Sequence, residues 1–550
     1  MLFTLRQWLA RTWNPRHTKR RPAIVRPSGI RRQLERLEDR NVPSVYLVTG
    51  TADGPGNVTA SATPGVNFNA TTLRAAVNAA NAHAGPDVII LPASASAYKL
   101  TTDHQLLVTD NLTIDGAGPA VSIIDGNLAT RIFEVKSAST ITLTLNGLTV
   151  RNGRAPLGDV PAHGAEDSSG GGILLQGTDD LTMTNCVVTG NQADAGSIAG
   201  DFGSAFGGGI YNDAGTTSLT NCTVSNNQAN GGTLLGGEGG GVAEGGGICS
   251  QGLAGTPDKG LVTIVNSTLA HNTATGGTNT AGDPGGNAAG GGLYVNLGNA
   301  RVISSTFNNN QADGGNTNFG GDDFGGNAFG GAIDSEDQLT VIDSTLTANQ
   351  ANGGILVGGE GSNDGEAQGG GINAFDATIS NSTITLNQAN SRSSAFGGGV
   401  ACSNEVSIVT VTSTIIATNT VSPGESSGGP DVSGAFTSGF HNLIGIEDSD
   451  ASGFTDNRVV PPGNATYEQV GSVAHPIDPI LGPLQFNGGP TMTEAELPGS
   501  PAINRGSNPD GLAYDQRGSG FLRTVEQTDV GAFEVQPISK RAYLISTLTG

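Results

Sequence analysis

A seven-fold repeat fills the middle of this chain and limits what the chain can fold into. Each repeat opens with small residues and one apolar residue, as GGGI does at 170–173, and closes with a short polar strand, as TNCTVSNNQA does at 220–229. The opening recurs at 207–210, 245–248, 290–293, 330–333, 369–372 and 397–400. The closing asparagines are 36, 45, 38, 39 and 38 residues apart. A repeat of this period indicates stacked similar units rather than a globule.

Within one repeat, apolar and polar residues alternate with a period of two, which is the signal of a β-strand. The residue equivalent to Val224 is apolar in the other repeats: Val188, Leu269, Phe307, Leu346 and Ile384. The residues equivalent to Ile210 form a second apolar column. Short strands joined by turn residues describe one coil of a parallel β-helix, with coils about 4.8 Å apart. We therefore predict an all-β fold, a parallel β-helix (solenoid) in which both columns point inward.

Asparagines recur at two corners of the predicted coil. One set is Asn185, Asn221, Asn266 and Asn381, and the other is Asn191, Asn227, Asn272, Asn310, Asn349 and Asn387. Asparagine tolerates the left-handed conformation that a corner needs, and stacked asparagines hydrogen-bond along the stack. Several of the first set also match the glycosylation pattern N-x-S/T. We favour a structural ladder of the second set, Asn191 to Asn387, over glycosylation.

Loops of about fifteen residues, made of Gly, Asn, Asp, Ala and Thr, connect the strands of successive repeats. Residues 276–292 and 314–331 are examples. We expect these loops to emerge on one flank as a continuous, mobile, acidic face without a core. Since loop closure entropy grows only slowly with length, deletion of residues 314–318 is expected to be tolerated.

Charge is distributed unevenly along the 550 residues. Residues 1–44 hold 11 Lys and Arg against 3 Asp and Glu, which leaves 15 against 46 in the rest. The acidic remainder argues against nucleic acid as a partner and is compatible with cation binding or solubility. No run of 18 apolar residues occurs, so no membrane-spanning helix is expected. The apolar start is interrupted by Arg6 and Gln7, unlike an ordinary signal peptide.

Four cysteines occur, and two of them occupy the same place in consecutive repeats. Cys186 and Cys222 would lie one strand spacing apart, so either a stacked thiol pair or a disulfide fits. Neither zinc-ligand spacing nor a CxxC motif is present, and no metal site is predicted.

Composition and periodicity divide the chain into five parts. They are 1–44, a basic targeting or processing segment; 45–92, an N-terminal cap; 93–435, the β-helix, with its repeats at 170–420; 436–535, a C-terminal cap domain; and 536–550, a tail. A disordered basic tail is the alternative for the first part. In the cap we predict a helix at 71–83, started by Thr71 or Thr72 and ended by Gly85, that covers the open end of the solenoid.

Several segments resemble known bacterial families. The GGAI and GGGI signatures with strands such as FNNN at 307–310 resemble the repeats of polymorphic outer-membrane proteins. Residues 46–56 and 71–92 resemble the CSLREA domain, with Thr71, Thr72 and Ala75 where that pattern has Cys, Ser and Glu. The resemblance implies a bacterial surface β-helix that is right-handed.

The last part of the chain carries the most specific resemblance. DPILGPLQFNGGPTMTEAELPGSPAINRGS at 478–507, DQRG at 515–518 and TDVGAFE at 528–534 are similar to the choice-of-anchor Q domain of bacterial surface proteins. LERLEDRNVPS at 34–44 resembles an N-terminal segment of exported proteins in compartmented budding bacteria. These resemblances imply a secreted or envelope-associated protein and bring no catalytic residue with them.

Catalysis would require acids at a defined separation, and bases are scarce in the repeats, being only Lys259, Arg301 and Arg392. The candidate acids are Asp179, Asp180, Asp322, Asp323, Asp334, Glu336, Asp337 and Asp343. We expect no catalytic, cofactor or metal residues, and an adhesive or structural role toward extracellular polysaccharide or cell-surface components. The alternative is a polysaccharide lyase or glycoside hydrolase with its site around 334–343. Calcium in the acidic loops at 320–327 and 358–366 is a further alternative, but these loops lack a nine-residue register.

Overall fold

The computed structural model describes residues 43–537, except residue 103 and the segments 159–166, 199–200, 234–238, 254–258, 281–282, 319–323, 359–362, 404–406 and 423–425. All described residues belong to one compact unit. The predictions for 1–44 and for the tail at 536–550 lie almost wholly outside the described residues.

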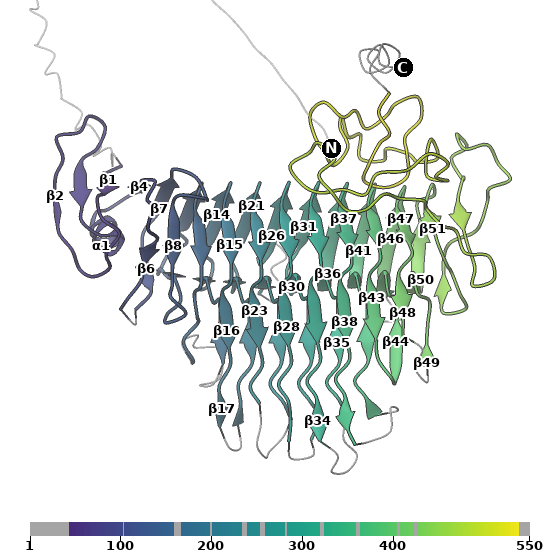
Figure 1. The fold of residues 1–550 in the computed structure, drawn as a ribbon, viewed down its shortest axis with the longest axis horizontal. Helices are drawn as coiled ribbons and strands as arrows, with labels where there is room; N and C mark the ends of the chain where they lie inside the picture. The colour runs from purple at the N-terminus through teal and green to yellow at the C-terminus, as the bar shows by residue number, and fades with distance from the viewer. Residues whose placement is uncertain are drawn as a thin grey trace, which may run out of the picture. The chain divides into compact units, whose positions relative to one another are not determined.

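The coils of the repeat region carry their main strands in the same order, and these strands pair in parallel with their counterparts in neighbouring coils (Figure 1). One coil consists of β20 (Ile210–Asn212), β21 (Thr216–Thr220), β22 (Thr223–Ser225), β23 (Gln228–Asn230) and β24 (Ala243–Glu244). β20 and β21 belong to a 22-stranded sheet, here sheet A, and β22 to the 12-stranded sheet B. β23 belongs to the seven-stranded sheet C and β24 to the eight-stranded sheet D. The predicted parallel β-helix is confirmed.

Both predicted apolar columns point into the solenoid. Ile210 pairs in register with Ile248, and Ile248 with Leu293. The second column also pairs in register, and all its members are fully buried: Val188, Val224, Leu269, Phe307, Leu346 and Ile384. Burying each such side chain stabilises the fold by about 1.5–3 kcal/mol. Stacking equivalent positions therefore builds a continuous thin core mainly from aliphatic residues.

The first asparagine corner is a left-handed backbone position. Asn185, Asn221, Asn266 and Asn381 have φ angles between 46° and 53°. Other coils place Ser304 (φ 48°), Asp343 (φ 53°) and Ser413 (φ 52°) among the left-handed residues. This corner thus requires a left-handed backbone conformation, which residues with short polar side chains adopt at low energetic cost.

The second asparagine set forms a buried hydrogen-bonded ladder. Asn227 Nδ2 donates to Asn272 Oδ1 at 2.9 Å and to the carbonyl oxygen of Val188 at 3.1 Å. Its Oδ1 accepts the backbone N–H of Asn191 at 3.0 Å and Asn191 Nδ2 at 2.9 Å. The left-handed residue at this corner is the preceding one, Asn226, with φ 55°. The amide is therefore needed here for its four hydrogen bonds rather than for its backbone.

The same pattern of donors and acceptors continues through the remaining members, in the order Asn272, Asn310, Asn349 and Asn387. It then extends beyond the predicted set to Asn419 and ends at a carboxylate, Asp431. Asp431 Oδ1 accepts Asn419 Nδ2 at 2.9 Å. Burial raises the pKa of Asp431 to about 7, against the hydrogen bonds that lower it.

The two cysteines that share a repeat position are buried free thiols. Each sulfur also contacts a nearby backbone carbonyl oxygen, Cys186 that of Thr184 and Cys222 that of Thr220, both at 3.3 Å. Of the two alternatives, the structure holds the stacked thiols and not the disulfide.

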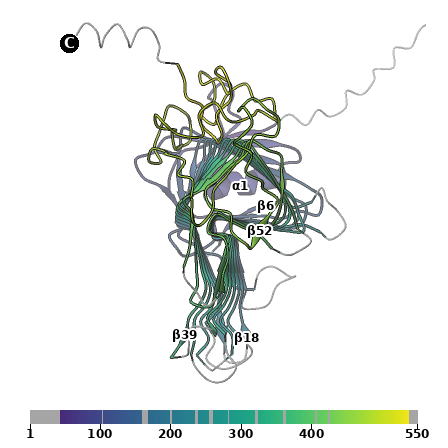
Figure 2. The ribbon, with the colours of Figure 1, turned by 90° about the vertical axis from the view of Figure 1, so that its right-hand side faces the viewer.

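Sheets C and D face each other and form a thin two-layered blade, here called the fin, which projects from the solenoid (Figure 2). Alanine fills the space between the layers in each coil. The fully buried members are Ala193, Ala229, Ala274, Ala312, Ala351 and Ala389 from sheet C, and Ala205, Ala243, Ala288, Ala328, Ala367 and Ala395 from sheet D. Because only alanine methyl groups lie between the two sheets, the fin is thin.

Beyond the alanines, glycine backbones take over the contact between the two layers. Gly277 N–H donates to the carbonyl oxygen of Gly241 at 2.7 Å, and Gly286 N–H donates to that of Gly277 at 2.9 Å. This zigzag of hydrogen bonds, the glycine column, runs through Gly203, Gly232, Gly241, Gly277, Gly286, Gly315, Gly326, Gly354 and Gly365. A Cβ atom on Gly277 would lie 2.0 Å from the carbonyl oxygen of Gly232, so no side chain fits.

The prediction of a mobile, coreless loop face is therefore wrong for the described parts of these segments. Residues 314–318 contain Gly314 and Gly315, whose backbones pack against the opposite layer, and the fully buried Thr317. Their deletion would break the glycine column, so the expected tolerance is withdrawn. Glycine is abundant here because the layers approach too closely for any other residue.

The N-terminal cap is built as predicted around one helix, α1 (Leu73–Ala82). Thr72 caps it by accepting the Ala75 N–H at 3.0 Å, whereas the helix ends at His83 rather than at Gly85. The apolar face of α1 joins the core of the solenoid. Strands β1 (Val45–Val48) and β4 (Asp87–Leu91) flank it and pair in parallel with each other.

The solenoid extends past the predicted boundary at residue 435. β51 (Leu443–Ile444) and β53 (Gln469–Val470) add to sheet B in parallel. Phe454 packs on Phe436 with ring centroids 5.2 Å apart, and both rings join the solenoid core. The segment between these strands thus covers the last coil.

Residues 471–537 lie along the outward face of sheet B, above β37 and β47 in Figure 1, and not on the end of the solenoid. Threonines of stacked coils hold them there. Thr345 Oγ1 donates to Gln516 Oε1 at 2.6 Å. Glu494 bridges two coils by accepting Thr347 Oγ1 at 2.9 Å and Thr385 Oγ1 at 2.6 Å. This C-terminal segment therefore binds several coils at once.

Candidate functional site

The concave corner between sheet A and the fin carries the most distinctive side chains of the molecule. An outward row of sheet A stacks there in register, in the order Leu174, Tyr211, Cys249, Tyr294, Asp334 and Asn373. In the earlier coils an apolar cluster of this row with sheet D fills the corner, formed by Leu174, Phe206, Tyr211, Cys249, Ala289 and Tyr294. The row changes from apolar to polar at Asp334.

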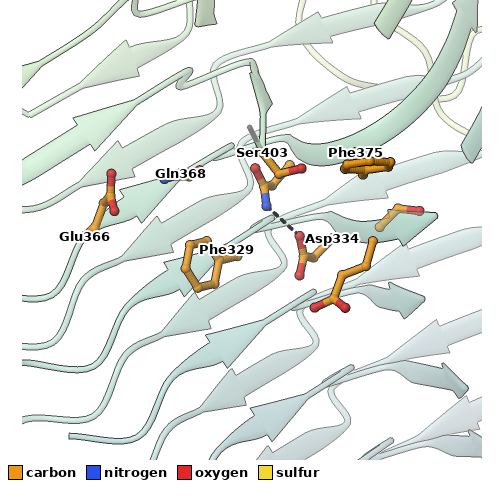
Figure 3. A pocket seen from close by; sticks show the side chains of 9 residues that line it. Phe329, Asp334, Glu366, Gln368, Phe375 and Ser403 are labelled. Atoms are coloured by element: carbon orange, nitrogen blue, oxygen red, sulfur yellow. Dashed lines mark hydrogen bonds between the residues drawn. The ribbon is translucent and has the colours of Figure 1, made fainter. Parts of the chain in front are cut away.

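At this change the corner opens into a pocket of about 500 Å³, here called the corner pocket. It lies over β36 (Ile333–Ile342), β41 (Ile372–Ser380) and β40 (Ala367–Gln368). Its lining residues are Phe329, Asp334, Ser335, Glu336, Glu366, Gln368, Asn373, Phe375 and Ser403. Figure 3 shows Phe329 and Phe375 on opposite sides of Asp334.

Hydrogen-bond acceptors dominate the floor of the corner pocket. Asn373 Nδ2 donates to Asp334 Oδ1 at 2.8 Å, the dashed line in Figure 3, and this bond fixes the orientation of the amide. Asn373 Oδ1 then has no hydrogen-bond partner, although Asn373 is only 5% exposed. Glu336 Oε1 accepts the Tyr294 hydroxyl at 3.0 Å.

Like charges lie close together in this corner, where Asp334 is buried and Glu336 is exposed. Burial raises the pKa of Asp334 to about 7, with a further contribution from the charge of Glu336. Burial also raises the pKa of Glu244, on β24, to about 8, and the charges of Glu336 and Asp334 act in the same direction. No Lys, Arg or His stands among the described residues that line the corner pocket.

A second hollow of about 240 Å³ lies farther along the same strands. Its lining residues are Gln338, Leu339, Thr340, Asp376, Ala377, Thr378, Ile408 and Thr410. The pairing of β36 with β41 shifts register between Ser335 and Gln338, and this bulge separates the two hollows. Since a strand rises about 3.3 Å per residue, the path from Asp334 to Thr340 spans about 20 Å of sheet surface.

The other predicted acids have different surroundings. Asp179 accepts the backbone N–H groups of Ser137 and Ile141, both at 3.0 Å, and so has a structural role. Asp343 is buried 3.8 Å from Arg523, beneath the C-terminal segment and away from the pocket.

Two further acidic candidates that the structure describes do not line the corner pocket. Asp180 accepts the Thr216 N–H at 2.8 Å, and Asp337 is not a lining residue. Asp322, Asp323 and parts of both proposed calcium loops lie outside the described residues. Among the residues that the structure describes, no group of His, Cys, Asp and Glu is placed to hold a metal ion.

The pairing of acids with aromatic rings was not predicted, because the partners come from different coils. Phe329 precedes the glycine turn of its coil, Asp334 follows that turn, and Phe375 lies one coil later. The residue after the inward Ile or Leu of three successive repeats is Tyr294, Asp334 and Asn373. Alignment of the repeats could therefore have shown that these side chains stack next to one another.

No protein-family model matches the chain, and no curated protein sequence matches it. Within 43–537, apart from the gaps given above, no helix is long and apolar enough to cross a membrane.

Proposed function

We propose that this protein is an exported, surface-associated β-helix that binds an extended glycan on the outer face of sheet A. The corner pocket carries the proposal, since it combines aromatic rings with carboxyl and amide groups. Glycan sites need apolar rings for the faces of the sugar and a few polar groups for its hydroxyls. Export is supported by the basic first 44 residues, whose charge is opposite to that of the rest, and by the family resemblances of the sequence.

The position of the two hollows supports an extended ligand. Both hollows lie on β36 and β41. A glycan chain that runs along these strands would contact Phe375 in the first hollow and Thr378 in the second. The strands here are stacked and hydrogen-bonded, which holds the contact groups in fixed positions. We expect adhesion through this face rather than through mobile loops.

A glycan array probed with the full chain tests the proposal. We expect glycan affinity to fall at least about ten-fold when Phe329→Ala and Phe375→Ala are combined. Contacts of the two rings with a sugar contribute about 1.5 kcal/mol or more to the binding free energy. Val357→Ala, an exposed apolar residue outside the pocket, is the control. Equal binding by all three proteins would contradict the proposal.

A glycoside hydrolase remains the second candidate, because one observation favours it. Asp334 and Glu244 have pKa values raised to about 7 and about 8, as a general acid at neutral pH requires. Hydrolysis predicts release of reducing ends from a bound polysaccharide and its loss in Asp334→Asn. Binding without release of reducing or unsaturated ends would reject the hydrolase and support the adhesive function.

A further inference from the structure

The lining of the corner pocket holds three carboxyl groups, and its donors are amide and hydroxyl groups without positive charge. Asp334 Oδ1 accepts from the amide NH2 group of Asn373, and Glu336 Oε1 accepts from the Tyr294 hydroxyl. Glu366 adds a third carboxyl group to the lining. A ligand that complements this pocket has to bring donors and positive charge.

Asn373 Oδ1 is an independent sign of a missing donor. A buried amide oxygen without a partner costs about 1–3 kcal/mol. This oxygen belongs to a residue that is 95% buried and lines the cavity, and its amide is held in place by Asp334. A donor entering the pocket would satisfy it together with the adjacent carboxylate.

The two rings complete the pattern. Phe329 and Phe375 stand on either side of Asp334 and are each partly buried (Figure 3). The face of an aromatic ring attracts a cation through its quadrupole, by about 0.5–2 kcal/mol. Acidic acceptors between two aromatic rings fit an organic cation better than a neutral hydroxyl group.

We infer that the corner pocket binds the primary ammonium group of an amino sugar within the glycan. An ammonium group has three donors, which match the Asp334 carboxylate, the Glu336 carboxylate and Asn373 Oδ1. Its charge relieves the repulsion between carboxylates, and the sugar ring contacts Phe329 or Phe375. The inference rests on the proposed glycan-binding function and names its substrate class.

The test compares two ligands that differ only in the amine. Calorimetric titration of the full chain with a hexamer of β-1,4-linked glucosamine is expected to show binding, and the fully N-acetylated hexamer is expected to bind at least about ten-fold more weakly. Equal binding of the two hexamers would overturn the ammonium assignment and leave glycan binding in place. No binding of the glucosamine hexamer would also overturn it, while the glycan array judges the proposed function separately.

Variants locate the binding in this pocket. Asp334→Asn keeps the volume of the side chain and should weaken the glucosamine hexamer about ten-fold or more, whereas Asp194→Asn, on the outer face of β16 (Gln192–Asp194) in the fin, should not. Phe375→Leu should weaken it several-fold, and as a partly exposed position it tests the pocket even where Asp334→Asn folds poorly. Unchanged affinity in both pocket variants would overturn the assignment. If hexalysine bound as tightly as the glucosamine hexamer, the assignment of the ammonium group to an amino sugar would be overturned.

Discussion

Gly277→Ala should destabilise the protein far more than an ordinary surface substitution. The added methyl group would lie 2.0 Å from the carbonyl oxygen of Gly232 and 2.7 Å from the backbone nitrogen of Gly241, whereas real Cβ contacts stay above 3.0 Å. Gly232 belongs to the neighbouring coil of the same layer and Gly241 to the opposite layer, so both would have to move away from Gly277 by about 1 Å, which lengthens the hydrogen bonds of Gly277 with Gly241 and Gly286 beyond a useful distance.

The magnitude follows from these contacts. Two buried backbone hydrogen bonds left unsatisfied cost about 1–3 kcal/mol each, and overpacking adds about 1–3 kcal/mol. We therefore expect a loss of about 3–9 kcal/mol in the free energy of unfolding the fin, a large share of a typical total of about 5–15 kcal/mol. The change should also spread to neighbouring glycines, since each member of the column is both donor and acceptor.

Urea unfolding combined with hydrogen exchange measures the effect, because a repeat protein can open locally before it unfolds. Exchange should accelerate at Gly286 and Gly315, which donate into the column. Gly482→Ala is the matched control, since its Cβ would have only ordinary contacts at 3.5 Å. If the two variants differed by less than about 1 kcal/mol, the tight packing of the fin would be refuted.

Three further predictions concern the ladder, the pH dependence and the C-terminal segment. Asn272→Ala should lower stability by about 2–4 kcal/mol, because it removes the acceptor of the Asn227 backbone N–H, one acceptor of Asn227 Nδ2 and a donor to the carbonyl oxygen of Val224; thermal unfolding against Thr275→Ala, on the fin surface, tests this. Burial raises the pKa of Asp431 to about 7, so the folded state binds a proton that the unfolded state has already lost above pH 4. Stability should therefore fall as pH rises from about 4 to 7, and a slope unchanged in Asp431→Asn would contradict this. Glu494→Ala should expose residues 471–537 to proteolysis, whereas Glu494→Gln, whose amide can accept from one threonine hydroxyl and donate to the other, should protect them better.

The solenoid could be predicted because its columns are written directly in the sequence. Val224 and its equivalents are apolar at one fixed position of every repeat, and each coil repeats the same local pattern. The start of α1 at Thr72 followed from ordinary capping chemistry. Such features depend on residues close together in one repeat.

The fin could not be predicted by the same reasoning, because glycine has two uses. Runs such as 276–277 and 285–286 were interpreted as flexible loops, since glycine usually marks conformational freedom. Here they mark close contact between the two layers of the fin. The available signal was positional: glycine pairs recur at the same places in successive repeats, at 231–232, 276–277, 314–315 and 353–354.

The corner pocket escaped prediction for a different reason. Asp334 was recognised as a candidate within an acidic patch, but its aromatic neighbours depend on how far one coil is displaced from the next along the sheet. Phe329 and Phe375 stand 46 residues apart in the sequence, on β35 (Ala328–Phe329) of sheet D and on β41 of sheet A, and only the stacking of successive coils brings them to one pocket.

The construction of the fin also bears on how such a chain evolves. One coil contributes a share to the apolar core, one asparagine to the ladder and two glycine pairs to the fin, so a duplicated coil carries everything that its neighbours require. The longest, 45-residue repeat takes up length outside these contacts, with nine residues between β25 (Ile248–Gln251) and β26 (Leu261–Val265) where the preceding coil has three between β20 and β21. Whole-coil duplication and drift at the turns are therefore the permitted routes of variation, whereas a partial duplication would leave one sheet a strand longer than its partners.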